Sequence, residues 1–167
     1  FSKDYQSGVL SFEIISNGKK LISNSGYFSD KKNKLNKLSK STALQSTLII
    51  EDYSSCIYQK TSGLDYIIDK GCKITKKNIV FEKNYWKISA EHDGYLKQYD
   101  IIHKRELEFY PEESKFVGHD KIISKKETKN LKFEIRFHLE PNTKVMKTQD
   151  SKSIFIDLNG EGWKFNS

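Results

Sequence analysis

Apolar and polar residues alternate near the start of the chain in a way that predicts a β-hairpin over residues 9–26. Leu10, Phe12 and Ile14 fall at every second position, so their side chains would share one face of a strand. Asn17 and Gly18 follow, and this pair readily adopts the positive φ angles of a type I′ turn. We therefore expect two short antiparallel strands joined at Asn17-Gly18.

Similar short runs recur from residue 57 onward at intervals of about 8–12 residues, a spacing typical of β-sandwiches and barrels. Tyr85–His92 and Tyr95–Tyr110 flank Asp93-Gly94, so we expect a second hairpin with a tight turn there. The lysine-rich residues 31–40 have no apolar face and predict a loop with at most a short helical turn. The pattern predicts one antiparallel all-β domain over residues 1–167, with little helix. Further strands are expected at residues 47–50, 116–124, 131–139, 143–148 and 153–158.

The net charge of the chain excludes few classes of binding partner. The net charge is +7, but of the 29 basic residues only Arg105 and Arg136 are arginines. Nucleic-acid recognition favours the rigid fork of arginine, and the lysines are spread along the chain, so we expect no nucleic-acid partner. Diffuse positive charge would suit an acidic polysaccharide equally well. No run of eighteen apolar residues occurs, so the sequence predicts no transmembrane helix.

The cysteines and the N-terminus leave the cellular compartment open. Cys56 and Cys72 are too few for a disulfide framework and form no CxxC motif, and the sequence does not decide whether they pair. The chain begins at Phe1 without a signal peptide, and its one methionine is Met146. We therefore expect it to be an excised piece of a longer protein.

No sequence motif marks an active site by itself. The chain has no glycine-rich phosphate loop, HExxH or GxSxG pattern. Asp93 and Asp120 are expected to shape turns or cap backbone amides. The histidines lie on separate segments without the spacing of zinc ligands, so each is expected to be a hydrogen-bonded or solvent-facing strand residue. They are His92, His103, His119 and His138.

Five segments, taken in order, resemble the C-terminal β-domain of heparinase II/III-like proteins, and most closely a bacterial branch of that family. They are residues 10–26 (LSFEIISNGKKLISNSG), 40–55 (KSTALQSTLIIEDYSS), 91–109 (EHDGYLKQYDIIHKRELEF), 133–141 (FEIRFHLEP) and 160–165 (GEGWKF). The resemblance implies a two-layer, supersandwich-like antiparallel β-sandwich that follows an N-terminal (α/α) toroid domain.

The same resemblance implies a function for the longer protein. Such enzymes are lyases that cleave uronic-acid-containing polysaccharides, including glycosaminoglycans, by β-elimination. Their catalytic tyrosine lies in the toroid domain, so the domain in hand would be inactive alone. A periplasmic or secreted location is also implied.

The chain departs from the family pattern where the family binds zinc. The family's H-x-H-x-D stretch falls on residues 4–8, which places Asp4 at the first histidine position and Gln6 at the second. Two further zinc-ligand positions fall on Asn24 and Gln45. Neutral carboxamides are poor zinc ligands but good hydrogen-bonding partners for one another. We therefore expect no cofactor, a polar network in place of the metal, and no catalytic residue, since Asp4 cannot act as a protonated histidine would.

A second reading is a non-catalytic module that binds acidic glycans or serves as a scaffold. In this reading exposed aromatic rings would stack on sugars while lysines contact carboxylates. Against it, Trp86 and Trp163 are expected to be core residues of strands. The candidate aromatics are Tyr85, Trp86, Tyr95, Tyr99 and Trp163.

Overall fold

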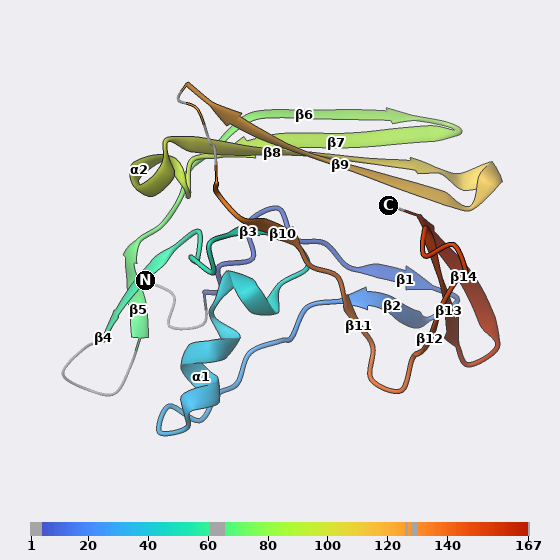
Figure 1. Ribbon diagram of the computed structural model, residues 1–167, viewed down its shortest axis with the longest axis horizontal. Helices are drawn as coiled ribbons and strands as arrows, with labels where there is room; N and C mark the ends of the chain where they lie inside the picture. Colours follow the sequence, from blue (N-terminus) through green and yellow to red (C-terminus); the bar gives the residue numbers. More distant parts are fainter. Residues whose placement is uncertain (1–4, 61–65, 126, 128–129, 167) are drawn as a thin grey trace.

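The protein is a sandwich of one long antiparallel sheet and a second layer built from shorter sheets (Figure 1). The computed structural model describes residues 5–60, 66–125, 127 and 130–166, so Asp4 lies outside the described residues. The long sheet has four strands in sequence order: β6 (Ile74–Glu82), β7 (Tyr85–His92), β8 (Ile101–Tyr110) and β9 (Lys115–Ser124). The expected all-β antiparallel sandwich is confirmed.

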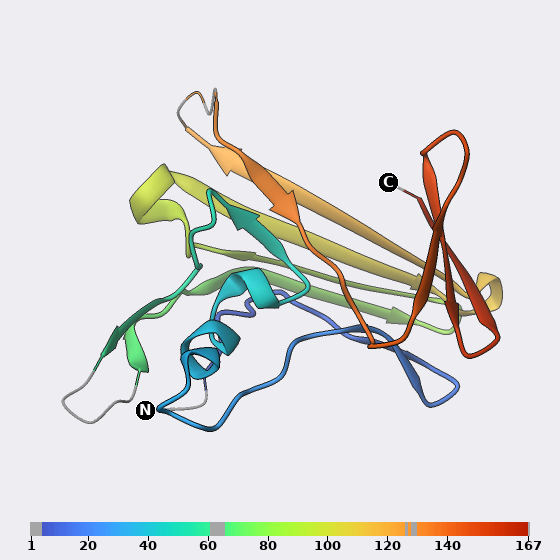
Figure 2. The same ribbon diagram turned by 60° about the horizontal axis from the view of Figure 1, so that its bottom comes forward.

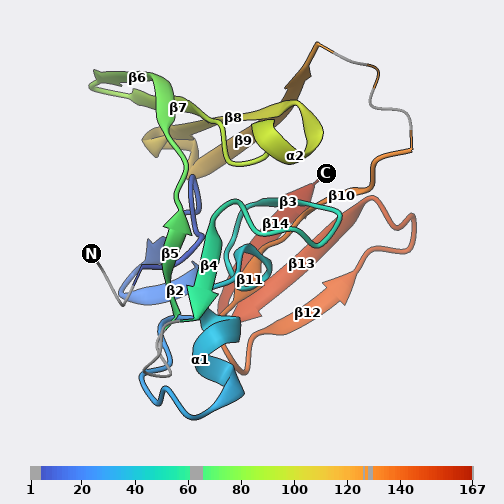
Figure 3. The ribbon, with the colours of Figure 1, turned by 90° about the vertical axis from the view of Figure 1, so that its left-hand side faces the viewer.

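The facing layer is assembled from strands that are distant in sequence. Its central pair joins β3 (Leu48–Ile50) to β10 (Phe133–Ile135). Beside it, β2 (Lys19–Ser23) pairs with both β1 (Ile14–Ser16) and β11 (His138–Leu139). The view along the long sheet shows the two layers one above the other (Figure 3).

Two smaller sheets complete the domain at its ends. At one end stand β12 (Lys144–Lys147), β13 (Ser153–Leu158) and β14 (Glu161–Asn166), as Figure 2 shows. At the other end is the hairpin of β4 (Ile57–Lys60) and β5 (Tyr66–Lys70). Among the described residues the α-helices are short, α1 (Lys34–Ser39) and α2 (Leu96–Tyr99), and none is long and apolar enough to span a membrane.

The apolar core lies in two clusters. The cluster between the layers contains Leu48, Ile50, Tyr95 and Ile101, each at most 1% exposed. The other cluster joins the β1–β2 hairpin to the terminal sheet through Leu21, Ile22 and Ile156. Burial of these side chains provides the main driving force for the two layers to associate.

The first hairpin forms where the sequence predicts it. Asn17 and Gly18 have φ angles of 47° and 76°, as a type I′ turn requires. Strand pairing begins only at Ile14, four residues after Leu10. The lysine-rich segment contains the helix α1, whose N-cap Asn33 accepts a hydrogen bond from the Leu35 amide.

Two of the predicted strand arrangements are wrong. Residues 131–139 do not form one strand. They form β10, which pairs with β3, and β11, which pairs with β2, and between them the Arg136 amide donates to the carbonyl of Thr47. The connection after His92 is not a two-residue turn but residues 93–100, which include α2. Tyr95 is buried in the core within this connection, and His92 pairs with His103 across the sheet.

Candidate functional site

A chain of hydrogen bonds among buried polar side chains runs across the inner face of the long sheet. The Gly94 amide donates to Nδ1 of His92 at 3.1 Å, so the proton of this imidazole must be on Nε2. Nε2 of His92 then donates to Nδ1 of His103 at 3.0 Å. Nε2 of His103 in turn donates to Oδ1 of Asp120 at 2.6 Å. The geometry thus fixes one tautomer for each imidazole.

Arg105 connects this chain to the facing layer. Its Nε and Nη2 donate to the two carboxylate oxygens of Asp120 at 2.8 and 2.9 Å, a bidentate ion pair. Its Nη1 donates to the carbonyl oxygens of Leu10 and Ser46, both at 2.9 Å. Leu10 presents that carbonyl from a left-handed backbone conformation, φ 58°, which is strained for a residue with a side chain.

The pKa values of the cluster follow from burial and from these contacts. Burial is the main reason that the pKa of His92 falls to about 3, with His103 and Arg105 acting in the same direction. Burial also lowers the pKa of His103 against the opposing effect of the Asp120 carboxylate. Burial by itself would raise the pKa of Asp120, but hydrogen bonds from His103 and Arg105 outweigh it and lower the pKa. At neutral pH the cluster therefore holds two neutral imidazoles and one compensated ion pair.

Ser46 is the point at which the segments of the facing layer meet. Its amide donates to Oδ1 of Asn24 at 2.8 Å, and its hydroxyl donates to the carbonyl of Ser23 at 2.7 Å. The same hydroxyl oxygen accepts from the His138 amide at 2.9 Å, while the Ser46 carbonyl accepts from Arg105. Ser46 itself is fully buried.

Neighbouring residues of the 42–47 segment hold the N-terminal part of the chain. Oγ1 of Thr42 donates to the Ser7 carbonyl at 2.8 Å, and Oγ1 of Thr47 donates to the Val9 carbonyl at 3.2 Å. The Ala43 carbonyl accepts from Nε2 of His138 at 3.1 Å. We call residues 42–47, with Asn24, Arg105 and His138, the polar junction.

Two of the residues that the sequence resemblance aligns with zinc ligands, Asn24 and Gln45, bond to the backbone rather than to one another. Oδ1 of Asn24 is used by the Ser46 amide, and Nε2 of Gln45 donates to the carbonyl of Ser39 at 3.3 Å. Gln45 is only 1% exposed, and its Oε1 would lie 3.0 Å from a Cβ added at Gly8. Gln6 is half-buried on the adjacent N-terminal segment. The side chains of Asn24 and Gln45 thus hold backbone segments in place. These two hydrogen bonds do not form the expected network in which the carboxamides bond directly to one another.

These donors do not fit a zinc ion. The carboxamide oxygens lack the charge and basicity of the imidazole, thiolate and carboxylate ligands that zinc selects, and one of them already accepts a backbone N–H. Within the described ranges of the chain, no group of three or more histidine, cysteine or acidic side chains is arranged to hold a metal ion.

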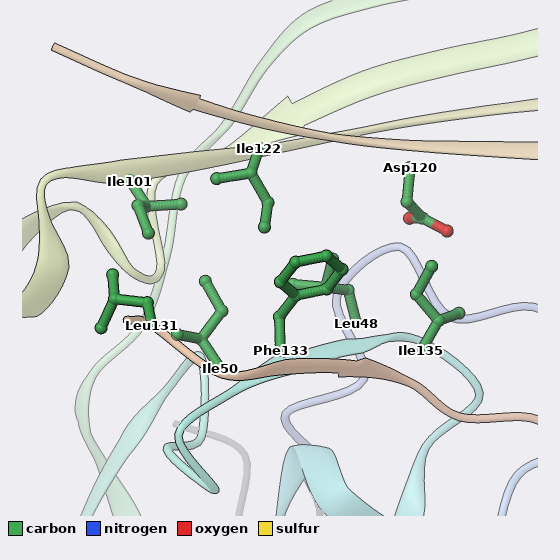
Figure 4. Close-up of a pocket in the computed structure, with 8 residues that line it drawn as sticks. All are labelled: Leu48, Ile50, Ile101, Asp120, Ile122, Leu131, Phe133 and Ile135. Atoms are coloured by element: carbon green, nitrogen blue, oxygen red, sulfur yellow. The ribbon is translucent and has the colours of Figure 1, made fainter. Parts of the chain in front are cut away.

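The cavity beside Asp120 is small and lined almost entirely by apolar side chains. It has a volume of about 270 Å³, and Figure 4 shows Asp120 at one side of an otherwise apolar lining. A polymer site would need an open cleft with several convergent polar groups. The lining residues are Leu48, Ile50, Ile101, Asp120, Ile122, Leu131, Phe133 and Ile135.

On the outer face of the long sheet, charges of both signs neutralise one another. Nζ of Lys87 lies 3.1 Å from carboxylate oxygens of both Glu106 and Glu108, and Nζ of Lys104 lies 2.7 Å from Glu106. His119 is exposed beside these pairs. Lys87 and Lys104 are thus paired with carboxylates in this part of the surface.

The aromatic residues considered for sugar stacking do not share one surface. Tyr95 is fully buried and donates its hydroxyl to the Leu48 carbonyl, so its expected exposure is wrong. Trp163 packs on the cluster of Leu21 and Ile22, as a core residue would. Trp86 and Phe109 pack together with ring centroids 5.2 Å apart.

The contact between His92 and His103 was not expected from the sequence, and the prediction that Asp120 shapes a turn is wrong. His92 and His103 are neighbours on adjacent strands, and Asp120 lies inside β9 rather than in a turn. Asp93 does cap a backbone amide, since its Oδ1 accepts from the Lys73 amide at 2.7 Å. The sequence did contain one signal. His103 and Arg105 follow Ile101 at every second position, so they lie on the same face of the strand as Ile101, the face expected to be apolar.

The fold and the polar junction define an antiparallel β-sandwich domain whose two layers are joined through buried polar side chains. The chain matches the family described as "Heparinase II/III-like, C-terminal" over residues 1–167, and it belongs to that family. No curated protein and no solved structure gives a significant match.

Proposed function

We propose that this domain is the non-catalytic C-terminal β-domain of a longer polysaccharide lyase that cleaves uronic-acid-containing polymers by β-elimination. Family membership supports the lyase parentage. The observation that supports the non-catalytic role is the use of Asn24 and Gln45, which the sequence resemblance aligns with zinc ligands, in hydrogen bonds to the backbone. In this proposal the domain serves as a rigid support for an N-terminal toroid domain, and no metal takes part.

The requirements of the reaction favour this division of labour. β-Elimination needs a group that neutralises the C5 carboxylate, a base that removes the C5 proton and an acid for the leaving oxygen. His92 and His103 are at most 1% exposed and are used in hydrogen bonds within the protein. His138 bonds the Ala43 carbonyl. The imidazoles of His92 and His103 are therefore out of reach of a polymer, and in this proposal the chemistry depends on side chains of the toroid domain.

A lyase assay on the longer protein tests the proposal. The full-length protein is incubated with a panel of uronic-acid polymers, with and without a chelator, and the ultraviolet absorbance of the unsaturated uronide product is followed. We expect turnover by the full-length protein that the chelator does not reduce, and none by the domain alone.

Two results would contradict the proposal in different ways. Turnover by the isolated domain would show that catalytic groups lie within this chain. Loss of turnover by the full-length protein on addition of the chelator would show that the reaction needs a metal ion. Absence of turnover across the panel by a folded full-length protein would favour the alternative, a scaffold or a module that binds acidic glycans.

A further inference from the structure

The two cysteines of the chain lie in direct contact. Cys56 immediately precedes β4, and Cys72 lies between β5 and β6. Because Ile57 pairs with Lys70, the antiparallel β4–β5 hairpin returns the chain to the level of Cys56. The sulfur atoms are 3.7 Å apart. A disulfide bond has a sulfur–sulfur distance of about 2.05 Å, so the two atoms need to approach by less than about 2 Å.

The surroundings of the two sulfurs differ. Cys56 is 2% exposed, whereas Cys72 is partly exposed. The hydrogen bond from the Cys72 thiol is the main cause that lowers the pKa of Cys56 to about 6, and the hydroxyls of Ser55 and Ser7 add to it against the effect of burial. The same hydrogen bond between the two sulfur atoms is the main cause that raises the pKa of Cys72. Cys56 is thus the buried thiolate of the pair, and Cys72 carries the proton and is the sulfur that solvent reaches.

We propose that Cys56 and Cys72 are a redox modification site that closes to an intramolecular disulfide by exchange with a small disulfide such as oxidised glutathione. The Cys56 thiolate, 3.7 Å away, takes the proton of Cys72 as Cys72 attacks one sulfur of the oxidant and releases one glutathione thiolate, and Cys56 then loses that proton to solvent. The Cys56 thiolate then attacks the Cys72 sulfur of this mixed disulfide and expels the second glutathione thiolate. Two protein thiols are oxidised to one disulfide, and one glutathione disulfide is reduced to two thiols.

Closure of this bond would fix the β4–β5 hairpin to the chain that enters the long sheet. Figure 3 shows β5 leading directly into the strands of that sheet. The hairpin also contacts the N-terminal segment, since the Ser7 hydroxyl lies 3.2 Å from the Tyr58 hydroxyl, which donates to the Tyr5 carbonyl at 3.1 Å. The disulfide would therefore restrain the hairpin that contacts Tyr5 and Ser7, independently of the function proposed above.

A peptide map of the protein as expressed tests the site directly. The protein is equilibrated with graded ratios of reduced to oxidised glutathione, free thiols are alkylated, and the sample is digested and analysed by mass spectrometry without reduction. We expect the peptides containing Cys56 and Cys72 to become linked, with the loss of two hydrogen atoms, as the oxidised form increases. Alkylation of both sulfurs at every ratio, or glutathione adducts without a linked peptide, would overturn the proposal.

Single serine variants test the assigned roles. Cys56→Ser should accumulate glutathione on Cys72, because the sulfur that resolves the mixed disulfide is gone. Cys72→Ser should remain largely unmodified over the same time, because Cys56 is buried. If instead the glutathione adduct forms faster in Cys72→Ser than in Cys56→Ser, the proposed order of attack is wrong. The map of the unsubstituted protein remains decisive if either variant fails to fold.

Discussion

At the scale of single residues, Arg105 places a full positive charge between the layers and surrounds it with acceptors. Its guanidinium is bound by both Asp120 oxygens and by the carbonyls of Leu10 and Ser46. Arg105 is 3% exposed, so water offers little substitute for these partners. A buried ion pair adds little net stability compared with apolar packing, but the loss of one partner leaves the other charge uncompensated at high cost.

Asp120→Asn should therefore destabilise the domain strongly. The substitution keeps the shape of the side chain and removes the charge that compensates Arg105. We expect the free energy of unfolding to fall by about 3 kcal/mol or more. Urea unfolding followed by circular dichroism measures it.

Glu113→Gln provides the matched control for this prediction. Glu113 also pairs with a basic residue, Lys115 at 3.5 Å, but both side chains are more than half exposed. Its substitution should change the unfolding free energy by less than about 0.5 kcal/mol. Equal effects of the two substitutions would show that the buried charge pair has no special role.

At the scale of elements, the connection from β7 to β8 sets the register that brings His92 to His103. Residues 93–100 hold the short helix α2, and Asp100 ends it in a left-handed conformation, φ 59°. Gly94 lies in this connection, close to Ser55 and His92. A Cβ built there would be 2.7 Å from the Ser55 carbonyl oxygen and 3.0 Å from Nδ1 of His92.

Gly94→Ala should disturb this connection, because the added methyl group meets backbone rather than a flexible side chain. We expect a loss of about 1–3 kcal/mol in the unfolding free energy, the usual cost of forcing extra volume into a packed site. Gly162→Ala is the control, since no atom lies within 4 Å of its added Cβ. That variant should be unchanged or slightly more stable, by up to about 1 kcal/mol. A tolerated Gly94→Ala in thermal and urea unfolding would contradict the close approach.

Strand positions were predictable at this scale because they depend on local patterns. The Asn17-Gly18 turn is set by the two residues that form it, and the alternation in 85–92 and 153–158 gives strands with those bounds. The β7–β8 register was not predictable from Asp93-Gly94. A turn pair suggests the shortest connection, whereas the burial of Tyr95 depends on Leu48, which is distant in sequence.

At the scale of the whole molecule, buried neutral imidazoles couple the stability of the fold to pH. An unfolded histidine has a pKa of about 6.5, whereas the pKa of His92 in the folded domain is about 3. Between these values the unfolded chain binds a proton that the folded domain does not, so stability falls as the pH falls. The lowered pKa values of His103 and Asp120 act in the same direction.

The unfolding free energy should accordingly decrease from about pH 6.5 towards pH 3, by up to about 1.4 kcal/mol per pH unit for His92 alone. Urea unfolding at pH 7, 6 and 5 gives the slope. His92→Gln should flatten it, and His119→Gln, on the exposed outer face, should retain it. An unchanged slope in His92→Gln would mean that His92 is not the source of the acid sensitivity.

The candidate site was only partly predictable because it is assembled across the molecule. Gln6, Asn24 and Gln45 were expected at zinc-ligand positions from a resemblance of short sequence segments, and that assignment stays a prediction. Their hydrogen-bond partners were not predictable, since the Asn24 bond depends on where Ser46 is placed. Likewise, nothing local pairs Asp120 with His103, because that contact requires the register of β8 and β9 to be known.

The bonds of Ser46 also bear on how the chain reaches this structure. Its partners are 22, 23, 59 and 92 residues away, at Asn24, Ser23, Arg105 and His138. None of these hydrogen bonds can form until a long loop of the chain has closed. Each loop closure lowers the conformational entropy of the chain before the new contacts compensate for that loss. Chains dominated by such distant contacts fold in about milliseconds to seconds rather than microseconds. The polar junction is thus expected to form late in folding, and until then the edges of β3 and β2 that pair with β10 and β11 stay exposed to aggregation.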